Sequence, residues 1–94
     1  MTPRWEPSSE KHGVPRHDQI HAILHASYVR ILDGQVPEGR IVIYIGPAHA
    51  QTDRELEILV HEHPDSGKEA SIFHAMPLGP KYRRFRLENP DGWR

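Results

Sequence analysis

The spacing of hydrophobic residues changes along this chain, and the change predicts where helix gives way to sheet. Ile20, Ile23 and Leu24 recur at helical spacing, so they would form one apolar stripe on an amphipathic helix. Pro15 suits the first position of such a helix, because its missing N–H has no intrahelical partner to lose. We therefore expect a helix of about three turns over residues 15–26.

The segment ahead of this helix has a weaker pattern. Residues 1–7 contain two prolines and no period, which predicts a loose arm with Trp5 as its one apolar anchor. SSEKHG at residues 8–13 then predicts a short helical turn. Gly13 would end that turn, since glycine tolerates the left-handed backbone of a helix stop.

After Ser27 the pattern becomes that of β-strands. Short runs of β-branched and aromatic residues alternate with turn residues, which predicts four strands near residues 28–32, 40–45, 56–63 and 69–76. The connections are short and rich in Gly, Pro, Asp or Ser, so neighbouring strands should be antiparallel. The apolar run IVIYI at 41–45 is typical of a strand buried on both faces, and we expect it at the sheet centre. The predicted fold class is α+β, with one N-terminal helix or two packed on a four-stranded antiparallel meander.

The third and fourth predicted strands alternate in character. In the third, Leu56, Ile58 and Val60 would face the core, while the odd-numbered positions from Glu57 to His63 would face solvent.

In the fourth strand, simple alternation places Ile72, His74 and Met76 on one face. The prolines and glycine at 77–80 prevent the strand from continuing. The basic residues 81–86 must therefore turn off the sheet while staying close to His74.

Composition limits the possible classes of protein. Ninety-four residues suit one small domain, with residues 86–94 as a C-terminal tail. The chain has no cysteine, so disulfides and thiolate zinc sites are ruled out. No apolar run approaches the roughly 20 residues that span a bilayer, and the N-terminus has no apolar signal region. We expect a soluble, cytoplasmic protein with no membrane partner.

The net charge of −1 hides an uneven distribution. Residues 81–94 hold five Lys or Arg against two acids, whereas residues 17–80 hold four against nine. Any binding to an anionic partner should therefore be led by the basic ends of the chain.

Four segments occur in an order that resembles a known family: KHGV at 11–14, a helix with His21, IYIGP at 43–47 and IFHAMPLGPKYRR at 72–84. This order resembles the BrnT-like toxins of type II toxin-antitoxin modules, within the RelE/ParE-type ribonuclease superfamily, and especially their short actinobacterial or phage-borne relatives. The resemblance implies a small α+β fold with a curved antiparallel sheet and metal-independent RNA cleavage that inhibits translation and growth. It also implies RNA and a cognate antitoxin as partners, in a homodimer or a toxin-antitoxin heterocomplex.

The residues themselves are suited to such chemistry. Cutting RNA without a metal requires a base, an acid and cations that stabilise a phosphorane. The predicted catalytic residues are His74, Lys81, Tyr82, Lys11, His12 and Glu57. The predicted RNA-binding residues are Arg83, Arg84 and Arg86. The alternatives are that His74 is a partly buried strand-end residue, that Tyr82 belongs to the core, and that the basic tail is a solvated face.

Other histidines have a spacing that could suggest a metal. Three lie four residues apart on the predicted helix: His17, His21 and His25. They lack the adjoining carboxylate of an HExxH site, so we expect surface histidines with no metal and no cofactor. His61 and His63 share a strand face with Glu57 and are expected to face solvent or a partner.

Two functions from different classes fit these observations. The first is the RNA-cleaving toxin. The second is a non-enzymatic interaction module with a degenerate RelE-like fold, which binds a phage or host protein.

Overall fold

The structure, a computed structural model, describes residues 3–32, 34 and 36–93. The elements in chain order are β1 (Arg4–Trp5), the 3-10 helix η1 (Pro7–Glu10), α1 (Arg16–Leu24), β2 (Tyr28–Leu32), β3 (Arg40–Pro47), β4 (Glu55–Glu62), β5 (Ser71–Pro77) and α2 (Pro80–Glu88). Residues 1–2 of the predicted arm, 33 and 35 of the first connection, and 94 of the tail lie outside the described part.

The strands form one sheet with the order β1-β5-β4-β3-β2. From β2 to β5 the pairs are antiparallel, whereas β1 runs parallel to β5. The α+β class is thus confirmed, but the four-stranded antiparallel meander is wrong, because β1 makes the sheet five-stranded and mixed.

The fifth strand comes from the segment that we expected to be loose. The Arg4 N–H donates to the Ala70 carbonyl at 2.9 Å, and the Glu6 N–H donates to the Ile72 carbonyl at 2.8 Å. Without β1, the edge of β5 would present unpaired backbone groups to solvent. Trp5 is the expected anchor, since its ring packs against the core beneath α1.

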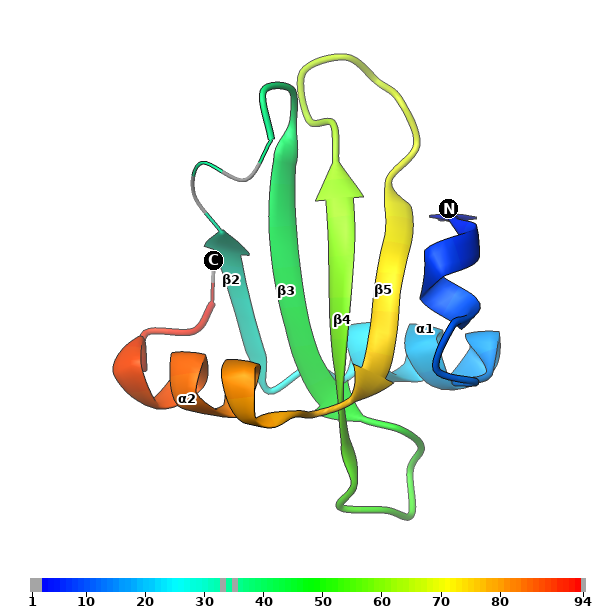
Figure 1. Ribbon diagram of the computed structural model, residues 1–94, viewed down its shortest axis with the longest axis vertical. Coiled ribbons are helices and arrows are strands. Elements are labelled where there is room, and N and C mark those ends of the chain that lie inside the picture. The colour runs from blue at the N-terminus through cyan, green and yellow to red at the C-terminus, as the bar shows by residue number, and fades with distance from the viewer. Residues whose placement is uncertain (1–2, 33, 35, 94) are drawn as a thin grey trace.

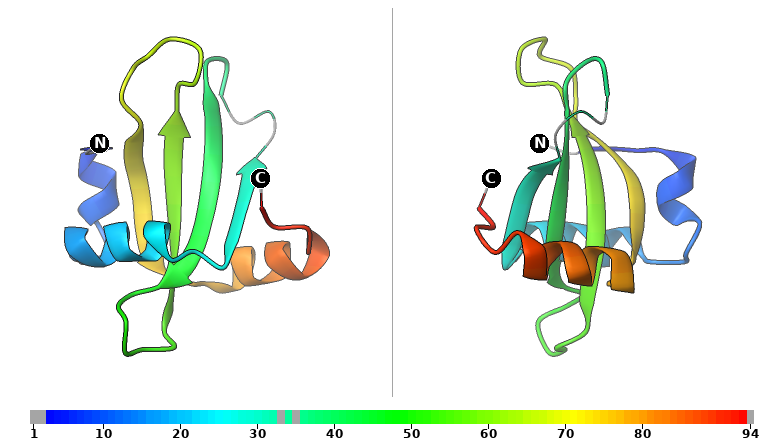
Figure 2. Two further views of the ribbon diagram at one scale, coloured as in Figure 1. Left: turned by 180° about the vertical axis from the view of Figure 1, so that it is seen from behind. Right: turned by 60° about the vertical axis from the view of Figure 1, so that its left-hand side comes forward.

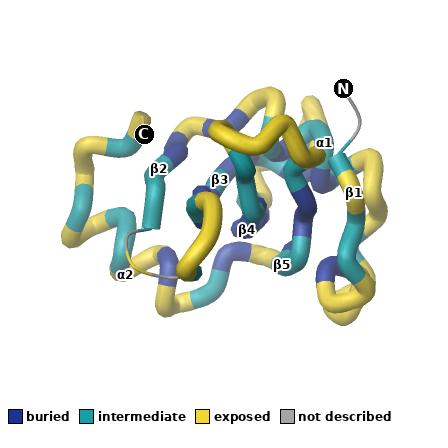
Figure 3. Tube along the Cα trace, turned by 90° about the horizontal axis from the view of Figure 1, so that it is seen from above, coloured by how far each residue is buried: buried dark blue, intermediate teal, exposed yellow. Residues whose placement is uncertain are grey.

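The two helices cover opposite faces of the sheet, with α1 behind and α2 in front in Figure 1, and Figure 2 shows the same layers from two other sides. The buried cluster on the α1 face includes Ala22, Leu56, Ile58, Val60 and Ile72. The buried cluster on the α2 face includes Ile41, Ile43, Ile45, Leu59 and Tyr82. Buried positions follow the strands in Figure 3. The β3 run 41–45 is enclosed on both faces as predicted. The strand at the centre of the sheet is β4, however, and not β3 as we expected.

α1 is shorter than predicted, and two residues of the predicted stripe, Ile20 and Ile23, pack against the buried cluster on this face. Gln19 and Ala22 are its buried residues, whereas Leu24 is 74% exposed. Gly46 on β3 permits this close approach, because a Cβ there would overlap the Ala22 carbonyl oxygen. Gly13 has a φ of 71°, as expected for a residue that ends the preceding turn.

A β-bulge changes the side-chain pattern of β5. Leu59 of β4 pairs with His74, but the next residue, Val60, pairs with Ile72, so Phe73 is an extra residue in β5. The predicted alternation is therefore wrong: Ile72 lies in the cluster under α1, while His74 is opposite Leu59 on the α2 face.

α2 forms directly after the proline-rich turn. Pro80 occupies its first turn, where a missing N–H costs no hydrogen bond. Tyr82 and Phe85 pack onto the sheet, so the face that holds Glu57 and Leu59 is covered rather than solvated as predicted. No helix within the described residues is long and apolar enough to cross a membrane.

An ion pair fixes the far end of α2 to the sheet. Both guanidinium nitrogens Nη1 and Nη2 of Arg86 donate to the Glu55 carboxylate, at 2.8 and 3.0 Å. Hydrogen bonds from Arg86, and secondarily its charge, hold the pKa of Glu55 below the ordinary value of 4.5. Because the folded-state pKa is the lower one, the pair stabilises the fold above pH 4.5 and loses this contribution as the pH falls through the folded value.

We predict that Arg86→Gln makes the free energy of unfolding less dependent on pH in the acidic range. The free energy of unfolding of the wild type should fall more steeply than that of the variant as the pH is lowered from neutral to below 4.5. Urea titrations across this range measure the difference. Parallel profiles for the two proteins would show that the Glu55 pair does not couple protonation to folding.

Candidate active site

The carboxylate of Glu57 joins three parts of the fold. The side chain comes from β4 and is only 5% exposed. Its Oε2 lies 2.8 Å from Nε2 of His74 on β5, and its Oε1 accepts the Gly79 backbone N–H at 2.8 Å, at the N-terminus of α2. A buried carboxylate requires such donors, since an unpaired charge in the interior is costly.

This pairing determines how His74 can act. A carboxylate only accepts hydrogen bonds, so Nε2 of His74 carries the donated hydrogen and Nδ1 is the nitrogen left for proton exchange. The His74 side chain is 26% exposed, and solvent can therefore reach it. An acidic group that orients a histidine in this way is a recurring arrangement in general acid–base catalysis.

The N-terminal segment brings a second imidazole to this place. The rings of His12 and His74 meet edge to face, with centroids 5.7 Å apart. The Ser8 hydroxyl donates to the Phe73 carbonyl at 2.5 Å, which fastens η1 to the bulge next to His74. Lys11 is exposed beside His12. Three of the predicted catalytic residues, His74, Glu57 and His12, are thus brought together, with Lys11 at the rim.

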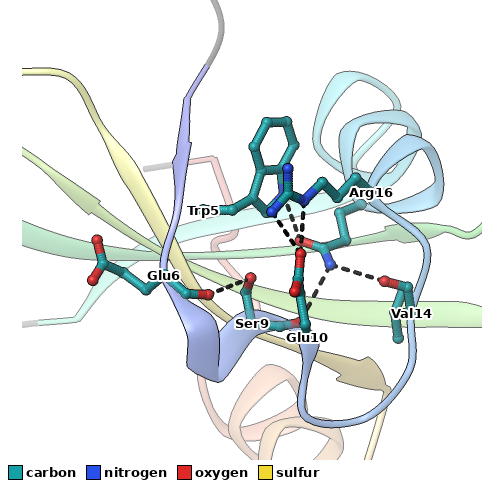
Figure 4. Close-up of polar contacts among 7 residues, drawn as sticks. Trp5, Glu6, Ser9, Glu10, Val14 and Arg16 are labelled. Atoms are coloured by element: carbon teal, nitrogen blue, oxygen red, sulfur yellow. Dashed lines mark hydrogen bonds and ion pairs between the residues drawn. The ribbon is translucent and has the colours of Figure 1, made fainter.

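A buried glutamine fixes the position of that segment. Gln19 is fully buried, and its Oε1 accepts the indole N–H of Trp5 at 3.0 Å. Its Nε2 donates to the carbonyls of Ser9, at 3.3 Å, and Val14, at 3.0 Å. Figure 4 shows these contacts, which connect β1, η1 and the following loop to α1. The turn that carries Lys11 and His12 lies between the two bonded carbonyls.

The predicted residues of α2 have separate roles in the structure. Tyr82 is a core residue, only 9% exposed, with the Lys81 ammonium 5.2 Å from its ring centroid. Arg83 donates to the Leu78 carbonyl, at 3.4 Å. Arg86 is engaged by Glu55, as described above, and does not present a free guanidinium.

Lys81 and Arg84 are exposed on one side of α2, where they line a surface pocket of about 450 Å³ with Phe85. Within the described part of the chain, no hydrogen bond or ion pair links either residue to His74. The sequence placed these cations beside the histidine. The structure places them on the outer side of the helix that begins there.

The other histidines do not gather into a metal centre. No group of three or more His, Cys, Asp or Glu side chains that could hold a metal ion occurs among residues 3–32, 34 and 36–93. His21 Nδ1 lies 3.0 Å from the Pro47 carbonyl, and its ring stacks on His25.

Three contributors to the site were missed by sequence reasoning: the Gly79 N–H, the Ser8 hydroxyl and the Gln19 amide. A backbone N–H carries no sequence signal. Gln19 did have a sequence signal, because Gln19, Ala22 and Ala26 recur at helical spacing. All three are buried in the structure.

Comparison with known protein families, with curated proteins and with solved structures finds no match for this chain.

We predict that Glu57→Gln disturbs both the fold and the state of His74. A glutamine amide cannot accept from both His74 and Gly79, so the free energy of unfolding should fall by about 1–3 kcal/mol. The His74 ring should also lose its preference for the Nε2–H tautomer, which imidazole ¹⁵N chemical shifts report. Glu69→Gln, an exposed change that removes the same charge, is the control. A Glu57 variant with wild-type stability and an unchanged tautomer would contradict the assigned contacts.

Proposed function

We propose that this chain is a BrnT-like, RelE-type toxin domain that cleaves RNA without a metal. The observation that supports the proposal most directly is the convergence of Glu57, His74 and His12, a buried carboxylate that orients one imidazole against a second. Phosphodiester cleavage through a 2′-hydroxyl requires one group to accept a proton and another to supply one. Two neighbouring imidazoles can meet both requirements, since one can accept a proton while the other supplies one.

In the proposed reaction, Nδ1 of His74 removes the proton of the ribose 2′-hydroxyl. The 2′-oxygen attacks the adjacent phosphorus, and a pentacoordinate phosphorane forms. His12 gives a proton to the departing 5′-oxygen, so the products are a 2′,3′-cyclic phosphate and a 5′-hydroxyl. Glu57 does not contact the substrate; it fixes the His74 ring and stabilises the imidazolium.

The cations have two proposed tasks. Lys11, adjacent to His12, is suited to the charge that develops on the phosphorane. Lys81 and Arg84 lie on the outer side of α2, where they can bind phosphates of the strand away from the cleaved bond. Tyr82 and Arg86 are left out of this interface, because Tyr82 is a core residue and Arg86 is paired with Glu55. Arg83 is exposed and makes one hydrogen bond of 3.4 Å to the Leu78 carbonyl, so it can join the interface.

The proposal includes a cytoplasmic target and a cognate antitoxin. Growth arrest would follow from the loss of RNA that translation needs. The antitoxin would restore growth by covering the group formed by Glu57, His74 and His12. Leu24, Leu87 and Trp93 are large apolar residues with more than two thirds of their surface exposed, so the chain has apolar surface for a protein partner. The same surface supports the alternative of a non-enzymatic interaction module.

We predict that His74→Gln abolishes growth arrest while the domain stays folded. Glutamine can still donate to Glu57 but cannot titrate, so the free energy of unfolding should change by no more than about 1 kcal/mol. Growth and bulk RNA integrity after induced expression, with unfolding curves of the purified protein, measure the two effects. His17→Gln is the matched control, since His17 is 85% exposed on α1.

The outcomes separate the two functions. Loss of RNA with wild type and with His17→Gln, but not with His74→Gln, supports the enzyme. A folded His74→Gln variant that remains toxic would remove His74 from catalysis. A wild type that neither arrests growth nor degrades RNA would favour the interaction module.

We also predict that purified protein retains RNA cleavage in excess EDTA. The proposed proton transfers use only side chains, and the described residues contain no cluster of metal ligands. Cleavage of a single-stranded RNA with and without the chelator measures this. Activity that disappears with EDTA and returns with Zn²⁺ or Mg²⁺ would replace the proposed mechanism.

A further inference from the structure

A second group of polar residues lies on the α2 face of the sheet, towards the end of β4 that α2 leaves uncovered. It surrounds a pocket of about 480 Å³, whose lining includes Arg4, His61, His63, Lys68, Ser71 and Phe73. These residues come from β1, from β4 with the loop that follows it, and from β5. The proposed catalytic chemistry uses none of them.

The pocket is next to the candidate active site along the sheet. His61 pairs with Ser71 across β4 and β5, and Leu59 pairs with His74. Two residues along a strand span about 7 Å, so the pocket begins roughly that distance from His74 on the same face. The rings of His61 and His63 lie together, with centroids 4.2 Å apart, and His61 Nε2 lies 2.7 Å from the Glu38 carbonyl.

The two cations of the pocket are held only loosely. Arg4 pairs with Glu6 at 2.9 Å and Lys68 pairs with Glu38 at 3.3 Å. Their side chains are 68% and 62% exposed, and ion pairs at such exposure contribute little, so either cation can turn to a bound anion. The lining also contains the carboxylate of Glu6, so its two cations, Arg4 and Lys68, exceed the anionic charge by one. The pocket therefore favours a phosphate group.

Phe73 adds an aromatic surface to this anion site. It is the bulge residue of β5, it lines the pocket, and it is only partly buried. A phosphate site beside an aromatic side chain is suited to a nucleotide, because any base can stack on such a ring.

We propose that this pocket binds one nucleotide of a single-stranded RNA, with its phosphate between Arg4 and Lys68 and its base against Phe73. The inference rests on the proposed function, since it adds a second nucleotide-binding position next to the nucleotide that is cleaved at His74. It assigns His63 to binding, where a ring N–H can donate to the phosphate or the ribose. The Nε2–H of His61 is taken by the Glu38 carbonyl, and its ring packs against that of His63.

The test uses ligands that the enzyme cannot cleave. Adenosine 5′-monophosphate, inorganic phosphate and a short single-stranded DNA, which lacks the 2′-hydroxyl, are titrated separately into ¹⁵N-labelled protein. The imidazole signals of His61 and His63 and the amide of Phe73 should shift with all three. Lys68→Gln should weaken binding of each ligand by about fivefold. Phe73→Leu should weaken the nucleotide and the DNA by about fivefold or more, but not inorganic phosphate.

Arg54→Gln is the control, because it removes one exposed charge from the loop at the opposite end of β4. Equal weakening by Arg54→Gln and Lys68→Gln would overturn the site, since general attraction would then explain binding. Adenosine monophosphate that binds no better than phosphate would overturn the role of Phe73. The ligand shifts are independent of cleavage, so binding here without any RNA cleavage would retain the site and reject the proposed function.

Discussion

The buried carboxylate of Glu57 is the constraint on which the site depends. A charge in this position must be paired, because an unpaired charge in the interior costs several kcal/mol or more. Its two donors are His74 and the N–H of Gly79, which lie on different elements. The same requirement therefore fixes the orientation of the imidazole and the point at which α2 begins. The orientation of His74 and the packing of the second helix share one cause.

The bulge at Phe73 makes this arrangement possible, and it marks the limit of prediction from sequence. Periodicity located β2 to β5 within about two residues, because strands and turns differ locally in residue type. Register is a property of the pair of strands, and one extra residue reverses which face each side chain takes. Without the bulge, His74 would lie on the α1 face with Ile72, and Glu57 would have no imidazole partner.

Residue type alone identified three side chains that lie together in the fold. His74, Glu57 and His12 were selected for their chemistry, and the fold brings them together. The cations of α2 were placed beside His74 from their nearness in sequence. A helix, however, distributes successive residues around its axis, so Tyr82 enters the core while Lys81 and Arg84 face outwards. Gln19 could not be found from apolar periodicity alone, because a polar residue adds nothing to an apolar helical stripe.

The choice of buried polar groups also bears on function. A domain of 94 residues has a modest core, and apolar side chains at Gln19, Glu57 and His74 would add to it. Gln19 instead hydrogen-bonds to the segment around the N-terminal turn, and Glu57 hydrogen-bonds to the start of α2. Both segments lie next to the imidazole of His74. Hydrogen bonds of this kind add little net stability but specify position closely. Their convergence on His74, rather than on an inert part of the core, is the strongest structural argument that this end of the sheet performs chemistry.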